Sequence, residues 1–173
     1  WKGTVLNGRM NAEAIVYAYN YEDMQQLRPF QTPPPVSNLD EVVNLDTEML
    51  GLELSATWLV TDRLRAIGSY SYNHAETSED AFFANVTFSE RDAQGNIIAD
   101  NVDGNRMTLT PEHKAALTLH YYIPSSIGEF SLGGTWSYMG SRYFDIENYN
   151  RQGSYDLLDL QASWTSASGR YKV

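Results

Sequence analysis

Apolar and polar residues alternate along most of the chain. In residues 50–60 the even-numbered positions are apolar, from Leu50 to Val60, whereas the odd-numbered ones are polar or small except for Leu59. The same alternation recurs in residues 64–72, 114–123, 130–139 and 158–164. A period of two is that of a β-strand with unlike faces. Each range is close to the roughly ten residues that a tilted strand needs to cross a bilayer.

Residues 9–21 predict a further strand, but its two faces are less distinct. Ile15, Tyr17 and Tyr19 share a face with the polar residues Asn11 and Glu13. This face is therefore partly aromatic and partly polar, unlike the faces of the later strands.

The connections between the predicted strands alternate between short and long. Short turns lie near residues 6–9, 60–63, 124–129 and 165–169, and long polar segments cover residues 22–47, 73–106 and 140–154. Because loops beyond about 12–15 residues are uncommon and usually functional, we expect the long segments to form a functional end of the sheet. More than half of the 22 acidic residues lie in the first two long segments. Basic residues gather near the short turns instead: Lys2, Arg9, Arg63, Arg65, Arg170 and Lys172.

Composition excludes several classes of protein. Of the 173 residues, 42% are hydrophobic and 13% aromatic, which is too many for a disordered chain. The mean hydropathy is −0.43 and no apolar run approaches 18–20 residues, which excludes a helical membrane protein but not a strand-based one. A net charge of −10 argues against nucleic-acid binding. The absence of cysteine excludes disulfides and thiol chemistry.

The distribution of aromatic residues favours a membrane barrel over a soluble one. Tyr70, Tyr72 and Tyr138 lie near the long connections, while other aromatic residues of the apolar face lie near the short turns: Trp58, Tyr121, Phe130 and Trp164. Small residues lie mostly on the polar face, as in a wet interior. Two aromatic girdles around an aliphatic band are typical of outer-membrane barrels. We therefore predict an all-β, antiparallel, up-and-down transmembrane β-barrel section of about eight strands.

Both ends of the chain read as incomplete strands. Residues 1–6 resemble the end of one strand, and residues 171–173 the start of another. Because open sheet edges are not stable in hydrocarbon, we interpret the chain as a section of a larger barrel.

Several short motifs resemble the barrel of TonB-dependent receptors. They occur in the expected order at hairpin spacing, and the resemblance spans nearly the whole chain apart from the long connections. The matching segments are residues 1–4 through 7–9, residues 17–25, residues 51–54 and 57–58, residues 61–64 and 68–72, residues 111–114 and 138–143 with Asn148, and residues 155–160.

This resemblance implies an outer-membrane protein of a Gram-negative bacterium with a 22-stranded barrel and an N-terminal plug. Residues 1–173 would be a partial barrel domain without that plug. The family imports scarce nutrients such as iron–siderophore complexes and receives energy from the TonB complex through the plug region. The expected partners are thus the TonB complex, a small nutrient ligand and outer-membrane lipid, with no nucleic acid. We expect neither an enzyme nor a cofactor. The alternative is a passive outer-membrane pore or structural barrel. An outer-membrane hydrolase ranks after both.

The sequence assigns no residue to a catalytic, cofactor-binding or metal-binding site, and it does not identify the ligand-binding residues. Residues 100–105 resemble a calcium loop, but Ala99 and Thr110 fail as its end ligands, so we interpret the segment as a polar turn. We expect a hairpin around residues 92–96 with Gly95 at positive φ. His74 has metal-capable neighbours in Glu76, Glu79 and Asp80, yet without a fixed ligand spacing it reads as part of a solvated loop.

Four further features have ordinary interpretations. His113 begins a strand, and His120 lies on the polar face with Ser131, Ser137 and Ser163 but without a nucleophile elbow or an orienting acid. The glycosylation sequon at residues 85–87 is read as chance. Prolines 33–35 are expected to stiffen the first long connection as a spacer.

Overall fold

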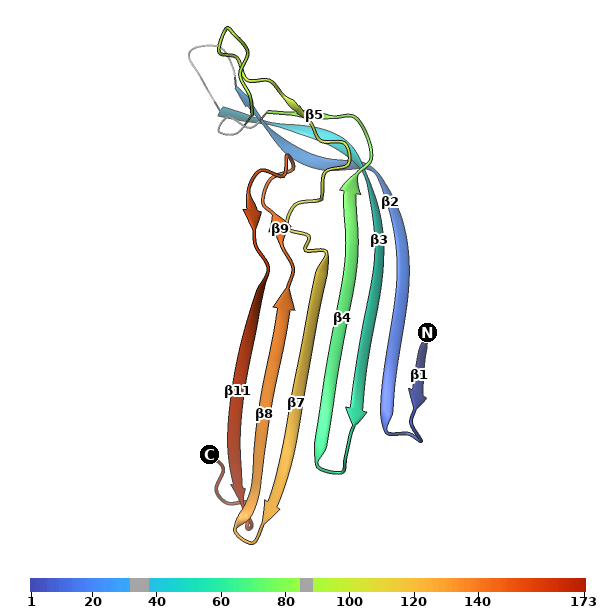
Figure 1. Cartoon of the computed structure of the whole chain (residues 1–173), viewed down its shortest axis with the longest axis vertical. Helices are drawn as coiled ribbons and strands as arrows, with labels where there is room; N and C mark the ends of the chain where they lie inside the picture. Colours follow the sequence, from blue (N-terminus) through green and yellow to red (C-terminus); the bar gives the residue numbers. More distant parts are fainter. Residues whose placement is uncertain (32–37, 85–88) are drawn as a thin grey trace.

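A computed structural model describes residues 1–31, 38–84 and 89–173, and their main feature is one antiparallel sheet. Its strands follow the chain order, so that neighbours in sequence are neighbours in the sheet (Figure 1). In that order they are β1 (Lys2–Val5), β2 (Met10–Gln31), β3 (Asn38–Leu59), β4 (Leu64–Thr77), β7 (His113–Ser125), β8 (Gly128–Met139) and β11 (Tyr155–Ser166). The described residues contain no helix long and apolar enough to cross a membrane.

The predicted all-β, up-and-down architecture is confirmed. Seven strands of the described residues pair in this sheet, compared with the expected number of about eight, and a bridge between Thr165 and Lys172 adds one further pairing. The short turns lie at one end of the sheet and the long connections at the other (Figure 1). Four strands of two residues each lie within the long connections: β5 (Phe82–Phe83), β6 (Asp100–Asn101), β9 (Arg142–Tyr143) and β10 (Arg151–Gln152).

The first long connection differs from the prediction, because most of it is strand. β2 and β3 continue their pairing from Met24↔Leu45 as far as Gln31↔Asn38, beyond a bulge between Tyr21 and Met24. At this bulge Asp23 adopts a left-handed φ of 58°. The bulge breaks the period of two, which explains why alternation did not reveal the upper part of the hairpin. Prolines 33–35, and the sequon at residues 85–87, lie outside the described residues.

The register places the predicted apolar positions in continuous rows across the sheet. Leu54 pairs with Tyr70, Tyr70 with Ala115, and Ala115 with Tyr138. Because directly paired residues point to the same side, the apolar positions of all these strands form one face. Leu158 and Leu160 are 67% and 77% exposed, which is unusual for leucine in a water-filled environment and ordinary for a lipid-facing surface.

The alternation of connections predicts the orientation of the sheet in the membrane. A single cysteine at Gln94, in a long connection, is expected to react with an impermeant maleimide on intact cells, because long loops of such barrels face outward. A cysteine at Asp62, in an equally exposed short turn, serves as the control and is expected to react only after lysis. Labelling of Asp62 on intact cells would reverse the orientation.

Candidate functional site

The long connections are packed together around a small buried core, which we call the cap. Leu45 comes from β3, Ala75 from β4 and Phe83 from β5, and the other members come from the connections between β4 and β7 and between β8 and β11. The complete set is Leu45, Ala75, Phe83, Val102, Met107 and Ile146. These are the buried hydrophobic residues of the described part of the chain. The barrel wall itself therefore has no buried apolar core, whereas its outer end does.

Hydrogen bonds join the β4–β7 connection to the β8–β11 connection within the cap. Asn148 Oδ1 accepts the Arg106 amide proton at 2.9 Å, and Asn148 Nδ2 donates to the Arg106 carbonyl at 2.9 Å. Asn105 Nδ2 donates to the Ile146 carbonyl, also at 2.9 Å. Asn148 has a left-handed φ of 62°, a conformation that asparagine tolerates better than most residues. Asn148 thus holds the β8–β11 connection against the β4–β7 connection.

The end of β4 is joined to the segment that resembles a calcium loop. The Thr77 hydroxyl donates to the Val102 carbonyl, and the Gly104 amide donates to the Thr77 carbonyl at 2.9 Å. Asn101 Nδ2 donates to Asp80 Oδ1 at 2.7 Å. No cluster of three or more metal-capable side chains occurs among the described residues. The segment is a hydrogen-bonded turn with Gly104 at a φ of +72°.

His74 belongs to a row of ionisable side chains, of which the sequence indicated only Glu76. Its Nε2 lies 3.1 Å from a Glu76 oxygen and its Nδ1 lies 3.3 Å from Glu112, which in turn lies 3.0 Å from Arg106. Glu79 and Asp80 do not join this group. Glu79 accepts the Asp46 amide proton instead, at 2.9 Å. The row ties the top of β4 to the start of β7.

His113 is part of the aromatic girdle near the long connections, and is not simply a residue at the start of a strand. The Tyr70 hydroxyl lies 2.8 Å from His113 Nδ1, and the ring of Tyr72 lies 5.2 Å from the His113 ring. His113 pairs directly with Tyr72, so the two side chains share the apolar face. The hydrogen bond satisfies the polar end of Tyr70 at the level where the membrane surface is expected.

His120 lies on the polar face, as predicted, in a hollow of about 450 Å³ that Ser131 and Ser163 also line. No hydrogen bond joins His120 to a serine among the described residues, and Ser137 lines a different hollow. The arrangement therefore has no nucleophile activated by a base.

The cap is rich in carboxylates, and two of them have pKa values shifted from those of ordinary acidic side chains. Burial raises the pKa of Glu147, and the carboxylates of Asp145 and Asp100 raise it further. Asp92 behaves in the opposite way, because the hydrogen bond from the Asn96 side chain lowers its pKa. Asp92 is the first residue of the predicted hairpin, which is confirmed by the pairing of Arg91 with Ile97 and the φ of +86° at Gly95. An acidic surface of this kind repels anions.

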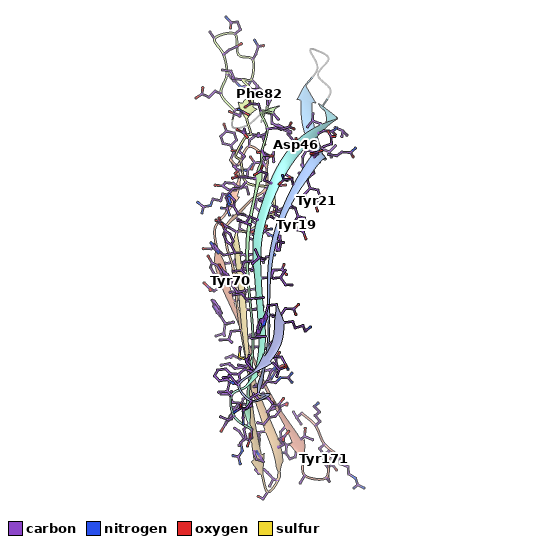
Figure 2. The ribbon with its side chains drawn as sticks, turned by 90° about the vertical axis from the view of Figure 1, so that its right-hand side faces the viewer. Tyr19, Tyr21, Asp46, Tyr70, Phe82 and Tyr171 are labelled. Carbon is purple, nitrogen blue, oxygen red and sulfur yellow. The ribbon has the colours of Figure 1, made fainter. Side chains whose placement is uncertain are left out.

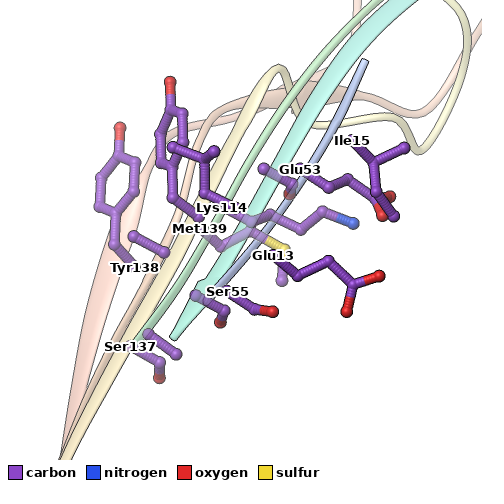
Figure 3. Close-up of a pocket in the computed structure, with 14 residues that line it drawn as sticks. Glu13, Ile15, Glu53, Ser55, Lys114, Ser137, Tyr138 and Met139 are labelled. Atoms are coloured by element: carbon purple, nitrogen blue, oxygen red, sulfur yellow. The ribbon is translucent and has the colours of Figure 1, made fainter. Parts of the chain in front are cut away.

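The polar face below the cap is hollowed and carries charged side chains. A cavity of about 430 Å³ is lined there by Glu13, Glu53, Lys114 and small residues such as Ser55. These side chains lie on one side of the sheet, whereas Tyr138 points to the other (Figure 3). The face that alternation assigned to a wet interior is thus polar and accessible.

A row of tyrosines on the polar face of β2 was visible in the sequence only as an imperfect alternation. Tyr17, Tyr19 and Tyr21 follow one another on this face, with ring centroids 5.4 Å and 6.2 Å apart. Figure 2 shows Tyr19 and Tyr21 on the side of the sheet opposite to Tyr70. The sequence therefore placed these tyrosines on one face of the strand. Because they are aromatic and that face is polar, they did not fit the expected alternation of apolar and polar faces.

Comparison with known proteins places this geometry in a family. A family profile described as TonB dependent receptor-like, beta-barrel matches residues 1–172. No curated protein matches the chain.

Solved structures share the fold at low sequence identity. The ferric yersiniabactin uptake receptor FyuA from Yersinia pestis has a TM-score of 0.70 at 19% identity, covering 96% of this chain and 21% of its own. The siderophore receptor PiuA from Acinetobacter baumannii has a TM-score of 0.68 at 18% identity, covering 94% and 21%. BauA, the ferric preacinetobactin receptor of the same organism, has a TM-score of 0.64 at 17% identity, covering 92% and 21%. The chain thus spans about a fifth of the length of these structures.

Proposed function

The chain belongs to the TonB-dependent receptor-like β-barrel family, whose members reside in the outer membrane of Gram-negative bacteria, and we propose that it is part of a receptor that imports a scarce nutrient. The observation that carries this proposal is the cap. A passive wall does not need long connections packed around a buried core, whereas a receptor needs an ordered outer surface to bind its ligand. The polar hollow below the cap then forms one side of the ligand vestibule.

An iron–siderophore complex is the first nutrient to test. PiuA is named as a siderophore receptor, and FyuA and BauA are named as receptors for ferric yersiniabactin and ferric preacinetobactin, although their low identity to this chain supports the fold alone. The excess of acidic over basic residues in the first two long connections favours a cationic, neutral or metal-chelated ligand over a bare polyanion.

Residues 1–173 would then form part of a barrel domain whose plug lies elsewhere in the complete protein. Coupling to the TonB complex would act through that plug, and the apolar face of the sheet would contact outer-membrane lipid. The family is one of receptors and transporters, not of enzymes. A hydrolase in the barrel wall therefore has no support from His120 or its neighbours.

The test is nutrient uptake by cells with and without TonB. Cells that express the complete protein are expected to accumulate a radiolabelled ferric siderophore from a panel of iron chelates, and deletion of TonB is expected to abolish this accumulation. Uptake that persists without TonB and rises linearly with concentration would favour a passive pore. A purified complete protein that conducts ions constantly in a planar bilayer would point to the same alternative.

A further inference from the structure

We propose that His74 is the pH-sensitive member of a latch that holds the cap together when the imidazole is charged and releases it as the pH rises. The latch consists of His74, Glu76, Glu112 and Arg106. This inference rests on the proposed function for its consequence, because the cap is there the outer surface that binds the ligand. It adds a form of regulation that ligand import by itself does not require.

Both ring nitrogens of His74 face carboxylate oxygens. Nε2 lies 3.1 Å from Glu76 Oε2, and Nδ1 lies 3.3 Å from Glu112 Oε1. A neutral imidazole carries one N–H, so its second nitrogen would turn a lone pair toward a carboxylate oxygen. The imidazolium ion donates a proton to each carboxylate instead. The placement of the two carboxylates therefore fits the charged form of His74.

The charges around His74 also favour its protonated form. The titratable and charged side chains beside it come from β3, β4, the β4–β7 connection and the start of β7: Glu48, Tyr72, Glu76, Arg106, Glu112 and His113. Three of these are carboxylates, and Arg106 is the one permanent cation among them. A proton on His74 therefore supplies a second positive charge to a group with an excess of negative charge.

Glu112 connects His74 to the β4–β7 connection. Its Oε1 faces His74, and its Oε2 accepts a hydrogen bond from Arg106 Nη2 at 3.0 Å. The side chains of Glu112 and Arg106 are 29% and 26% exposed. Water and salt therefore screen this pair less than a pair on the open surface. When His74 is neutral, Glu112 loses one of the two cations that hold it in place.

Arg106 is also the residue at which the two connections of the cap meet. The residues on either side of it are hydrogen-bonded to β4, at the carbonyl of Ala75 and the amide of Thr77. The amide and carbonyl of Arg106 itself bond to the side chain of Asn148, each at 2.9 Å. Displacement of Arg106 would therefore weaken the contact that holds the β8–β11 connection.

The direction of the pH effect follows from these contacts. They favour the charged form of His74, so uptake of a proton stabilises them. This stabilisation is present at acidic pH and is lost as the pH rises through the range in which histidine changes charge, about pH 5 to 8. Glu147, next to Asn148, acts in the same direction, because burial and neighbouring carboxylates raise its pKa. The cap is then most ordered in a mildly acidic medium.

Hydrogen exchange of the Arg106 amide measures the latch, because this amide is bonded to Asn148. The complete receptor in detergent is compared at about pH 5.5 and about pH 8, on either side of the usual titration of histidine. Each exchange rate is expressed as a protection factor, relative to an unstructured peptide at the same pH. We expect the protection factor to fall about fivefold from the acidic to the alkaline sample, the effect of losing one strong ion pair near the surface.

Three variants identify the residue that is responsible. His74→Gln carries no proton-dependent charge, and its protection factor is expected to change less than about twofold between the two samples, an ion-pair effect near zero. His120→Gln removes a histidine that pairs with Arg65 near the short turns, and is expected to keep the full change. Glu147→Gln removes the other titrating group beside Asn148, and is expected to keep most of the change.

A pH response that His74→Gln leaves intact would overturn the inference, and so would equal protection of the unmodified receptor in both samples. If the response vanished in Glu147→Gln and survived in His74→Gln, the pH sensitivity would belong to Glu147 and not to the latch. The exchange measurement needs no ligand. Failure of siderophore uptake with an intact pH response would therefore count against the proposed function alone.

Discussion

Leu119→Arg is expected to lower the free energy of unfolding of the complete barrel in lipid by about 2–4 kcal/mol. Leu119 pairs with Ala66 and Gly134 on the apolar face, between the aromatic residues of the two girdles. An arginine there would have to place its charge in hydrocarbon, where no water or counter-charge stabilises it. The measurement is reversible urea unfolding of the complete barrel in lipid vesicles, followed by tryptophan fluorescence.

Thr118→Arg is the matched control, because it introduces the same residue one position away. Thr118 lies on the polar face and its hydroxyl is 3.0 Å from that of Thr135. Its replacement removes one exchangeable hydrogen bond, and the arginine points toward water, so we expect a loss of about 1 kcal/mol. Equal losses for the two variants would mean that both faces meet the same solvent, which would contradict the membrane assignment.

The 173-residue segment expressed alone is expected to aggregate in detergent-free buffer and to show no cooperative unfolding. β1 and β11 are unpaired on their outer sides along most of their described length, and such edges recruit other strands. The apolar face adds a second cause, since leucines such as Leu132 and Leu158 are exposed across it. The small core of the cap cannot compensate for a surface of this extent.

Size-exclusion chromatography with light scattering, together with denaturant unfolding, measures this outcome. The complete barrel in detergent is the comparison, and it is expected to be monodisperse. A monodisperse monomer of the isolated segment in buffer, with a single sharp unfolding transition, would favour a soluble β-barrel over a membrane section.

The sequence by itself determined the strands of the wall and the direction in which each face points. Alternation is a local property, because successive side chains of a strand point to opposite sides whatever the strand pairs with. This is why β7, β8 and β11 begin and end within three residues of their predicted limits, whereas β4 begins as predicted but continues from residue 72 to Thr77, into the predicted long connection. The short turns followed from equally local signals, such as residues 6–8, which have positive φ in the structure.

Only the tertiary structure decided the cap and the contacts of its polar residues. Asn148 meets Arg106 across 42 positions in the chain, and His74 meets Glu112 across 38. No periodic pattern encodes such pairs, because they arise when separate connections fold over the same end of the sheet. The upper parts of β2 and β3 were also not predictable from the sequence. The bulge at Asp23 interrupts the alternation, so the pattern no longer indicates the pairing that continues beyond it. The tyrosines of β2 lie between these cases: the sequence placed Tyr17 and Tyr19 on the polar face, but only the register set Tyr17 against Gly51.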